Sequence, residues 1–189
     1  MGLLQTSSDS FHGQIPTILK INSSNTLATS LDQAVTGSID DALKLGCAAI
    51  GFTIYPGSDH NFSLMEEYRE LSLEAKSKGL AVVLWAYARG SNISKKGETA
   101  MNIISYAAHM SALLGANIIK VKLPSDFLEE DPTKAAFENN NIAIGTLQER
   151  VAHIKKVSFE GKRLVVFSGG DAKDDNALME EIKAIHFGG

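Results

Sequence analysis

Short apolar runs alternate with longer segments along this chain, and this alternation constrains the fold more than any other feature. Each run has the length of a strand and offers apolar side chains to both faces, as a parallel strand covered by other elements does. The runs are Ile15–Ile21, Ala48–Ile54, Ala81–Tyr87, Asn117–Leu123 and Arg163–Phe167. The helical segments are Ser38–Gly46, Ser63–Gly79, Gly97–Gly115, Thr146–Phe159 and Asp174–Phe187. We therefore expect an α/β fold with a parallel sheet and helices packed on it.

Glycines mark the predicted ends of three helices. Gly46, Gly79 and Gly115 each stand between a helical segment and the next apolar run, where a left-handed backbone conformation suits glycine. Ser38 and Asp41 have the spacing of a capping box at the start of the first helical segment.

Two architectures fit this order of elements: an open doubly wound sheet and a (β/α)8 TIM barrel. An open dinucleotide-binding sheet calls for G-x-G-x-x-G after the first strand, and Asn22-Ser23-Ser24-Asn25 stands there instead. We therefore expect the barrel, as one domain over residues 1–189. A complete barrel typically takes about 250 residues, so five runs in 189 residues indicate an incomplete one.

The fourth run, Asn117–Leu123, contains two lysines. Alternation places Lys120 and Lys122 on one face and Ile119 and Val121 on the other. The lysine face would point into the barrel near the carboxyl end of the strand, where barrel enzymes hold their chemistry. Two ammonium groups so placed disfavour each other's charge, and a neutral amine is what attacks a carbonyl. Alternatively, both lysines simply extend from the strand end into water.

Polar residues also end other runs. Trp85 and Tyr87 share a face of the third run and Arg89 follows; a phenol there can transfer protons and an indole can wall a sugar site, or both can be ordinary packing. Lys20 ends the first run and could bind an anion or reach water. After the last run, Ser168-Gly169-Gly170 could form a phosphate-binding nest or only a tight turn.

Composition and spacing exclude several other classes. The net charge of -4 provides no basic footprint for nucleic acid, and no apolar run approaches the roughly 20 residues of a membrane helix. Because Cys47 is the single cysteine and the N-terminus lacks an apolar signal segment, we expect a reducing, cytoplasmic setting. The five histidines lack metal-ligand spacing, so we expect no metal site.

Several of these motifs, taken in order, resemble the archaeal-type class I fructose-1,6-bisphosphate aldolase family. They are Ile15-Pro16-Thr17-Ile18-Leu19-Lys20, Gly51-Phe52-Thr53-Ile54-Tyr55-Pro56-Gly57-Ser58, Trp85-Ala86-Tyr87-Ala88-Arg89-Gly90, Gly115-Ala116-Asn117-Ile118-Ile119-Lys120-Val121-Lys122 and Ser168-Gly169-Gly170. The resemblance implies a lyase that needs neither a metal nor an organic cofactor. It would reversibly cleave fructose 1,6-bisphosphate into dihydroxyacetone phosphate and glyceraldehyde 3-phosphate, in glycolysis and gluconeogenesis.

The resemblance also implies roles for individual residues. Lys120 would form the Schiff base, Tyr87 would be the acid/base residue and Trp85 would line the site. Arg89 and the loop Ser168-Gly169-Gly170 would contact phosphate, while Lys122 and Lys20 would tune the charge near the substrate. The full-length family implies a homo-oligomer.

This chain departs from the family at both ends. Family members have two strands before the position of Ile15, with a catalytic aspartate after the first, and an eighth strand that ends in a Gly-Arg phosphate clamp. Here Met1–Gln14 precedes the first run and Gly188-Gly189 ends the chain. We therefore expect about strands 3 to 7 of the barrel. A related lyase or synthase acting on another sugar phosphate, or a catalytically silent fragment, remains an alternative.

Overall fold

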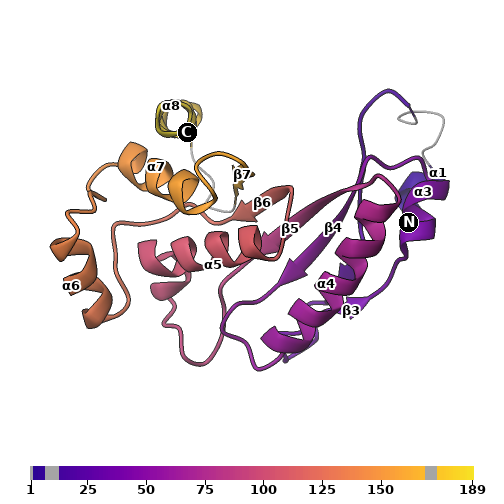
Figure 1. Cartoon of the computed structure of the whole chain (residues 1–189), viewed down its shortest axis with the longest axis horizontal. Helices are drawn as coiled ribbons and strands as arrows, with labels where there is room; N and C mark the ends of the chain where they lie inside the picture. The colour runs from indigo at the N-terminus through magenta and orange to yellow at the C-terminus, as the bar shows by residue number, and fades with distance from the viewer. Residues whose placement is uncertain (1, 7–12, 169–173) are drawn as a thin grey trace.

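The computed structural model describes residues 2–6, 13–168 and 174–189, and its centre is one five-stranded parallel sheet (Figure 1). The order across this sheet is β1-β4-β5-β6-β7. These strands are β1 (Ile18–Lys20), β4 (Ala49–Ile54), β5 (Ala81–Ala86), β6 (Ile118–Val121) and β7 (Leu164–Phe167). Each predicted run thus contributes one strand, which is one to four residues shorter than the run in every case.

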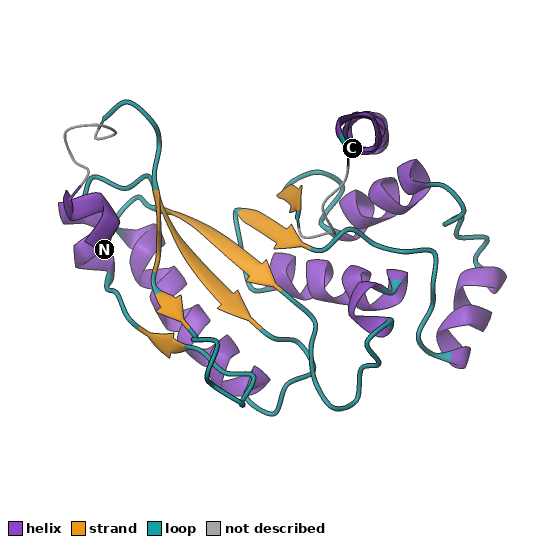
Figure 2. Ribbon diagram, turned by 180° about the vertical axis from the view of Figure 1, so that it is seen from behind, coloured by secondary structure: helices purple, strands orange, loops and turns teal. Residues whose placement is uncertain are grey.

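The strand order distinguishes between the two architectures that the sequence left in competition. In a doubly wound sheet the order reverses at a switch point and helices cover both faces. Here each strand of the sheet pairs with the next one along the chain, so right-handed crossovers place the helices on one face. Seen from behind, the strands lie in front of α4 and α5 (Figure 2). This arrangement is that of a barrel wall, and within the described residues β1 and β7 do not pair to close it.

The helices begin and end largely where the sequence predicted. The five predicted helical segments correspond to α3 (Ile39–Lys44), α4 (Asn61–Ser77), α5 (Met101–Leu113), α7 (Leu147–Val157) and α8 (Asp175–Gly188).

Local capping accounts for several of these helix ends. Ser38 and Asp41 form the predicted capping box on α3, and Thr146 forms a second one on α7. The predicted left-handed glycines are confirmed, with φ of 62° at Gly46, 83° at Gly79 and 86° at Gly115.

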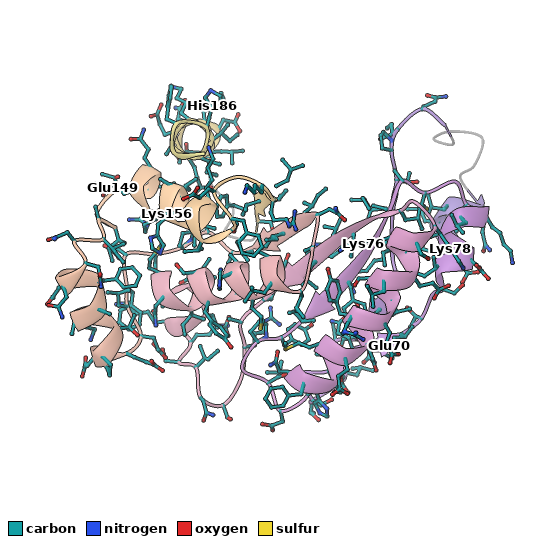
Figure 3. The ribbon with its side chains drawn as sticks, in the orientation of Figure 1. Glu70, Lys76, Lys78, Glu149, Lys156 and His186 are labelled. Carbon is teal, nitrogen blue, oxygen red and sulfur yellow. The ribbon has the colours of Figure 1, made fainter. Side chains whose placement is uncertain are left out.

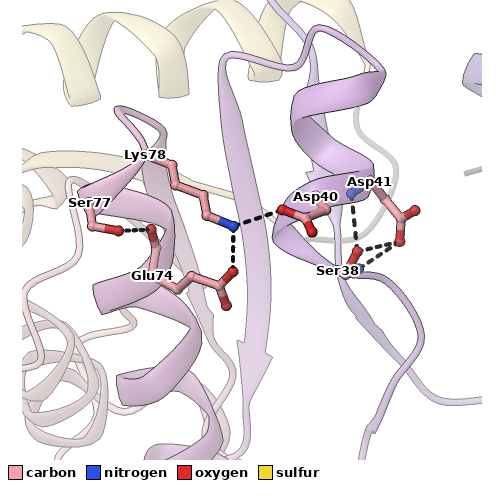
Figure 4. Close-up of polar contacts among 6 residues, drawn as sticks. All are labelled: Ser38, Asp40, Asp41, Glu74, Ser77 and Lys78. Atoms are coloured by element: carbon pink, nitrogen blue, oxygen red, sulfur yellow. Dashed lines mark hydrogen bonds and ion pairs between the residues drawn. The ribbon is translucent and has the colours of Figure 1, made fainter.

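Polar contacts at the end of α4 connect it to its neighbours. The Lys78 ammonium lies 2.7 Å from Asp40 of α3 and 2.8 Å from Glu74 (Figure 4). Lys76 donates to the carbonyl oxygen of Gly115, in the turn before β6. Lys76 and Lys78, like Lys156 of α7, belong to the helical layer (Figure 3). Exposed pairs of this kind add little stability individually.

One predicted helix, Gly97–Gly115, is divided in the structure. It consists of a short 3-10 helix, η1 (Gly97–Thr99), then Ala100 with an extended ψ of 141°, then α5. The segment after β6 explains the break: Ser125 donates to the Thr99 carbonyl oxygen, and the Met101 amide donates to the carbonyl oxygen of Phe127. These bonds occupy backbone groups that a continuous helix would use internally.

The sequence prediction also missed elements that lack a regular apolar pattern. They are α1 (Gly2–Thr6), a two-stranded antiparallel sheet of β2 (Asn22–Ser23) and β3 (Ala34–Val35), and α6 (Asp131–Asn139). No residue of α6 is fully buried, and its only large apolar side chain is the half-buried Phe137, so its sequence offers too short an apolar stripe to predict it.

The core lies between the sheet and the helices, and leaves the opposite face of the sheet for the site. Phe52, Leu84 and Ile119 point into the helical layer and are fully buried. On the other face the side chains at the sheet edges are open to water: Ile18 is 45% exposed and Leu164 67%. In the described parts of the chain, no helix has the length and apolar character to cross a membrane.

Candidate active site

Lys120 lies on the open face of the sheet, as the alternation in its strand predicted. Its neighbours Ile119 and Val121 are fully buried against the helices, whereas Lys120 and Lys122 are only partly buried. In the parallel register Lys120 pairs with Trp85 of β5. The side chains of paired residues share a face, so the amine and the indole are adjacent.

The Trp85 indole occupies space that only a glycine leaves free. The Lys120 Nζ lies 5.6 Å from the centroid of the indole. On the far side of Trp85, a Cβ added to Gly51 of β4 would fall 2.0 Å from the indole Cζ3. The indole therefore covers Gly51 of β4 and lies beside the amine.

Tyr87 and Ser168 meet over the strand that carries Lys120. Their hydroxyl oxygens lie 3.1 Å apart and share a hydrogen bond. Tyr87 follows β5 and Ser168 follows β7, the two strands that flank β6. The bond thus spans the carboxyl end of β6, where a parallel sheet places its functional groups. Gly169 and Gly170 lie outside the described residues.

Lys122 forms an ion pair with a residue that sequence reasoning missed. Its Nζ lies 2.7 Å from Oε2 of Glu98 in η1, and the two side chains are only 20% and 14% exposed. Burial alone would raise the pKa of Glu98, but hydrogen bonds from Lys122 and Lys95 outweigh it, and the pKa falls below its ordinary value. Glu98 therefore stays ionised at neutral pH and compensates the second cation of the lysine strand.

Lys20 forms hydrogen bonds that connect the end of β1 to Asn22 and Gln33. Although much of its side chain is exposed, its amine donates to Gln33 Oε1 at 2.9 Å, to Asn22 Oδ1 at 3.3 Å and to the carbonyl oxygen of Asn22. Partial burial lowers the pKa of Lys20. An ammonium has three protons to donate, so these three acceptors account for all of them in this conformation.

Arg89 lies beside Tyr55. Its guanidinium carbon is 5.7 Å from the Tyr55 ring centroid, and the Tyr55 hydroxyl accepts a hydrogen bond of 2.6 Å from Gln33. The Nε of Arg89 is buried without a hydrogen-bond partner in the part of the chain that is described. A buried donor of this kind is available to an anion.

The structure therefore assembles part of the predicted set and reveals residues outside it. Lys120, Trp85, Tyr87 and Ser168 converge, whereas Lys122, Lys20 and Arg89 each contact other groups. The added residues are Glu98, Asn22, Gln33 and Gly51. Of these only Gly51 left a sequence signal, as a glycine inside an apolar strand. Across the described ranges, no three His, Cys, Asp or Glu side chains gather as a metal ligand set would.

Comparison with known proteins identifies relatives that match much of the chain. The class 1 fructose-bisphosphate aldolase of Thermoproteus tenax is 37% identical over 117 residues, 61% of this chain and 44% of that protein. The class 1 fructose-bisphosphate aldolase of Halobacterium salinarum is 30% identical over 183 residues, 96% of this chain and 60% of that protein. The chain thus spans about half the length of these relatives.

Solved structures match the fold over essentially the whole chain. An archaeal fructose 1,6-bisphosphate aldolase has a TM-score of 0.79 at 28% identity, over 100% of this chain and 64% of that one. Another archaeal aldolase, with its catalytic Lys covalently bound to the carbinolamine intermediate of the substrate, has a TM-score of 0.78 at 26% identity, over 99% and 64%. The predicted barrel architecture is confirmed, as an incomplete wall.

The sequence resemblance to archaeal class I aldolases is confirmed by these relatives. A family model for the DeoC/LacD family aldolases matches residues 1–186, nearly the full length. This chain belongs to the DeoC/LacD family of aldolases.

Proposed function

We propose that this chain carries the Schiff-base site of a class I aldolase that reversibly cleaves fructose 1,6-bisphosphate into dihydroxyacetone phosphate and glyceraldehyde 3-phosphate. The observation that carries the proposal is the position of Lys120, on the open face of the sheet beside Trp85 and below the Tyr87–Ser168 hydroxyl pair. The proposed setting is the cytoplasm, and the proposed assembly is a homo-oligomer.

Lys120 would act as the nucleophile. Its neutral amine attacks the ketone carbon, and loss of water from the carbinolamine gives an iminium. The bond between the third and fourth sugar carbons then breaks, and its electron pair moves toward the iminium nitrogen to form an enamine. Glyceraldehyde 3-phosphate leaves; protonation of the enamine carbon and hydrolysis release dihydroxyacetone phosphate and regenerate the amine.

Tyr87 would transfer the protons of this sequence. Cleavage removes a proton from the hydroxyl of the carbon that becomes the aldehyde, and enamine release requires a proton at carbon. The Tyr87 phenol, 3.1 Å from the Ser168 hydroxyl, is anchored at the strand ends where such a substrate would extend. Trp85 lines the site and keeps water from the iminium.

The phosphate contacts in this proposal come from Arg89, whose Nε is buried and unpaired among the described residues, and from Ser168, Gly169 and Gly170. Lys122 and Lys20 tune the charge around the site through the contacts that hold them. Neither metal nor organic cofactor enters the proposed reaction, because the lysine iminium serves as the electron sink.

Borohydride reduction tests the nucleophile directly. With dihydroxyacetone phosphate, reduction of the iminium leaves a stable secondary amine, and peptide mapping is expected to find it on Lys120. Lys120→Met abolishes the adduct, whereas the matched strand variant Lys122→Met retains it. An adduct on Lys122 or Lys20 refutes the assignment.

Substrate specificity needs a separate measurement. The rate of cleavage of fructose 1,6-bisphosphate is compared with the rates for other phosphorylated ketoses, and we expect the bisphosphate to be preferred. If another sugar phosphate is preferred, the substrate assignment is wrong, but the role of Lys120 as the nucleophile still holds. Trapping without any turnover identifies a carbonyl-binding but catalytically silent chain.

A further inference from the structure

We infer that the face of the Trp85 indole stabilises the iminium cation formed on Lys120, and that Gly51 is the positioning residue that lets the indole lie there. This inference rests on the proposed function, since it concerns the intermediate on Lys120. It assigns Trp85 an electrostatic role in addition to lining the site.

Three adjacent strands bring these residues together. Trp85 of β5 pairs with Thr53 of β4 on one side and with Lys120 of β6 on the other. The Lys120 Nζ lies 5.6 Å from the indole centroid, within the roughly 6 Å over which a cation interacts with an aromatic face. The nitrogen that reacts therefore lies within cation–π distance of the indole before the reaction begins.

Gly51 fixes the direction in which the indole leans. A Cβ at position 51 would fall 2.0 Å from Cζ3 and 2.3 Å from Cη2 of Trp85, and 3.3 Å from Cγ2 of Ile18. Gly51 pairs with Val83, two residues before Trp85. The indole thus leans toward the amino-terminal half of β4 and rests against the bare backbone of Gly51, with Ile18 closing its far side.

The chemistry makes this contact different for the amine that attacks the carbonyl and for the iminium that it becomes. The attacking amine is neutral, whereas the iminium carries a positive charge shared by the same nitrogen. The negative face of an aromatic ring attracts a cation, and tryptophan does so most strongly. An interaction that appears only with the charge favours iminium formation over the neutral carbinolamine.

The chain has a single tryptophan, so fluorinated tryptophan introduced during expression changes this site alone. Fluorine withdraws electron density from the ring face with little change in size. We expect the iminium trapped on Lys120 at equilibrium with dihydroxyacetone phosphate to decrease with each added fluorine, by about 3- to 10-fold over a mono- to tetrafluoro series. Equal trapping across the series refutes the electrostatic role. Absence of a Lys120 adduct with ordinary tryptophan instead contradicts the proposed function.

Gly51→Ala tests the positioning role. The added methyl must displace the indole, so we expect a shifted tryptophan fluorescence emission and a loss of trapping similar to that of the most fluorinated protein. Gly145→Ala is the matched control, because Gly145 is exposed and its nearest atom to a new Cβ is Glu149 Oε2 at 3.6 Å. Unchanged emission and trapping in Gly51→Ala overturns the role of Gly51. If that variant does not fold, Trp85→Phe tests the contact between the indole and Lys120 instead. We expect less trapped iminium on Lys120 in Trp85→Phe, and unchanged trapping would overturn the role of the indole.

Discussion

The Glu98 carboxylate pairs with two lysines in very different surroundings, which allows a controlled test of the buried ion pair. Its Oε2 lies 2.7 Å from Lys122, whose side chain is 20% exposed, and its Oε1 lies 3.1 Å from Lys95, which is 89% exposed. Lys122→Met removes the buried partner and leaves a carboxylate that is 14% exposed and still pairs with the exposed Lys95. Removing one member of a fully buried pair costs about 3 to 5 kcal/mol; allowing for the residual exposure, we expect about 2 to 3 kcal/mol.

Lys95→Met deletes a cation from the same carboxylate at the protein surface, and we expect a loss below about 0.5 kcal/mol. Urea denaturation of both variants, followed by fluorescence of the single tryptophan and by circular dichroism, measures the difference. For a chain of this size, the loss in Lys122→Met corresponds to a melting temperature lower by about 4 to 12 °C. Equal effects of the two substitutions would refute the reasoning.

The contribution of this pair also depends on pH. Because the pKa of Glu98 is lower in the folded protein than in the unfolded chain, the pair stabilises the fold above the unfolded value. The stabilisation is lost as pH falls through the lowered folded value. The stability gap between the parent chain and Lys122→Met is therefore expected to narrow from pH 7 to below about pH 4. A constant gap would contradict the assigned charge state of Glu98.

Three further substitutions test other parts of the molecule. Tyr87→Phe should reduce turnover by about 10²- to 10⁴-fold while Lys120 still forms its borohydride adduct; unchanged turnover would leave Tyr87 a packing residue. Asn22→Leu removes an amide that bonds both the N–H and the carbonyl of Thr53 at 2.8 Å, and urea denaturation should show a loss of about 2 to 4 kcal/mol. Thr146→Ala removes the N-cap bond to the Glu149 amide and should cost about 1 kcal/mol in the same assay.

The sheet could be predicted well from the sequence, because each strand is one short continuous run whose helix-facing side chains are apolar. The run Asn117–Leu123 alternates so that Ile119 and Val121 must be buried, and this alone places Lys120 on the open face. The glycine turns were equally predictable, because a left-handed φ at Gly79 leaves few other residues possible.

What the sequence did not reveal depends on contacts between loops. Glu98 stands in a polar stretch, and nothing near it in the chain indicates that its partner is Lys122, directly after β6. The same holds for the break in the helix at Ala100, which Ser125 and Phe127 impose from the segment after β6. Pairings of this kind have no period, so pattern reasoning cannot find them.

The segment between β6 and α7 has two parts that a protein engineer could treat differently. Ser125, Phe127 and Glu129 bond the β5–α5 loop, with Glu129 accepting from the Ser94 amide at 2.6 Å and its hydroxyl at 2.8 Å, and so they support the turn that carries Glu98. In α6, which begins at Asp131, no residue is buried. Its half-buried Phe137 nevertheless packs against the core, beside His153 of α7. Asp131–Asn139 is therefore a graft point for a binding peptide or a shorter turn that keeps an apolar side chain at the place of Phe137, while the backbone around Lys120 keeps its supports.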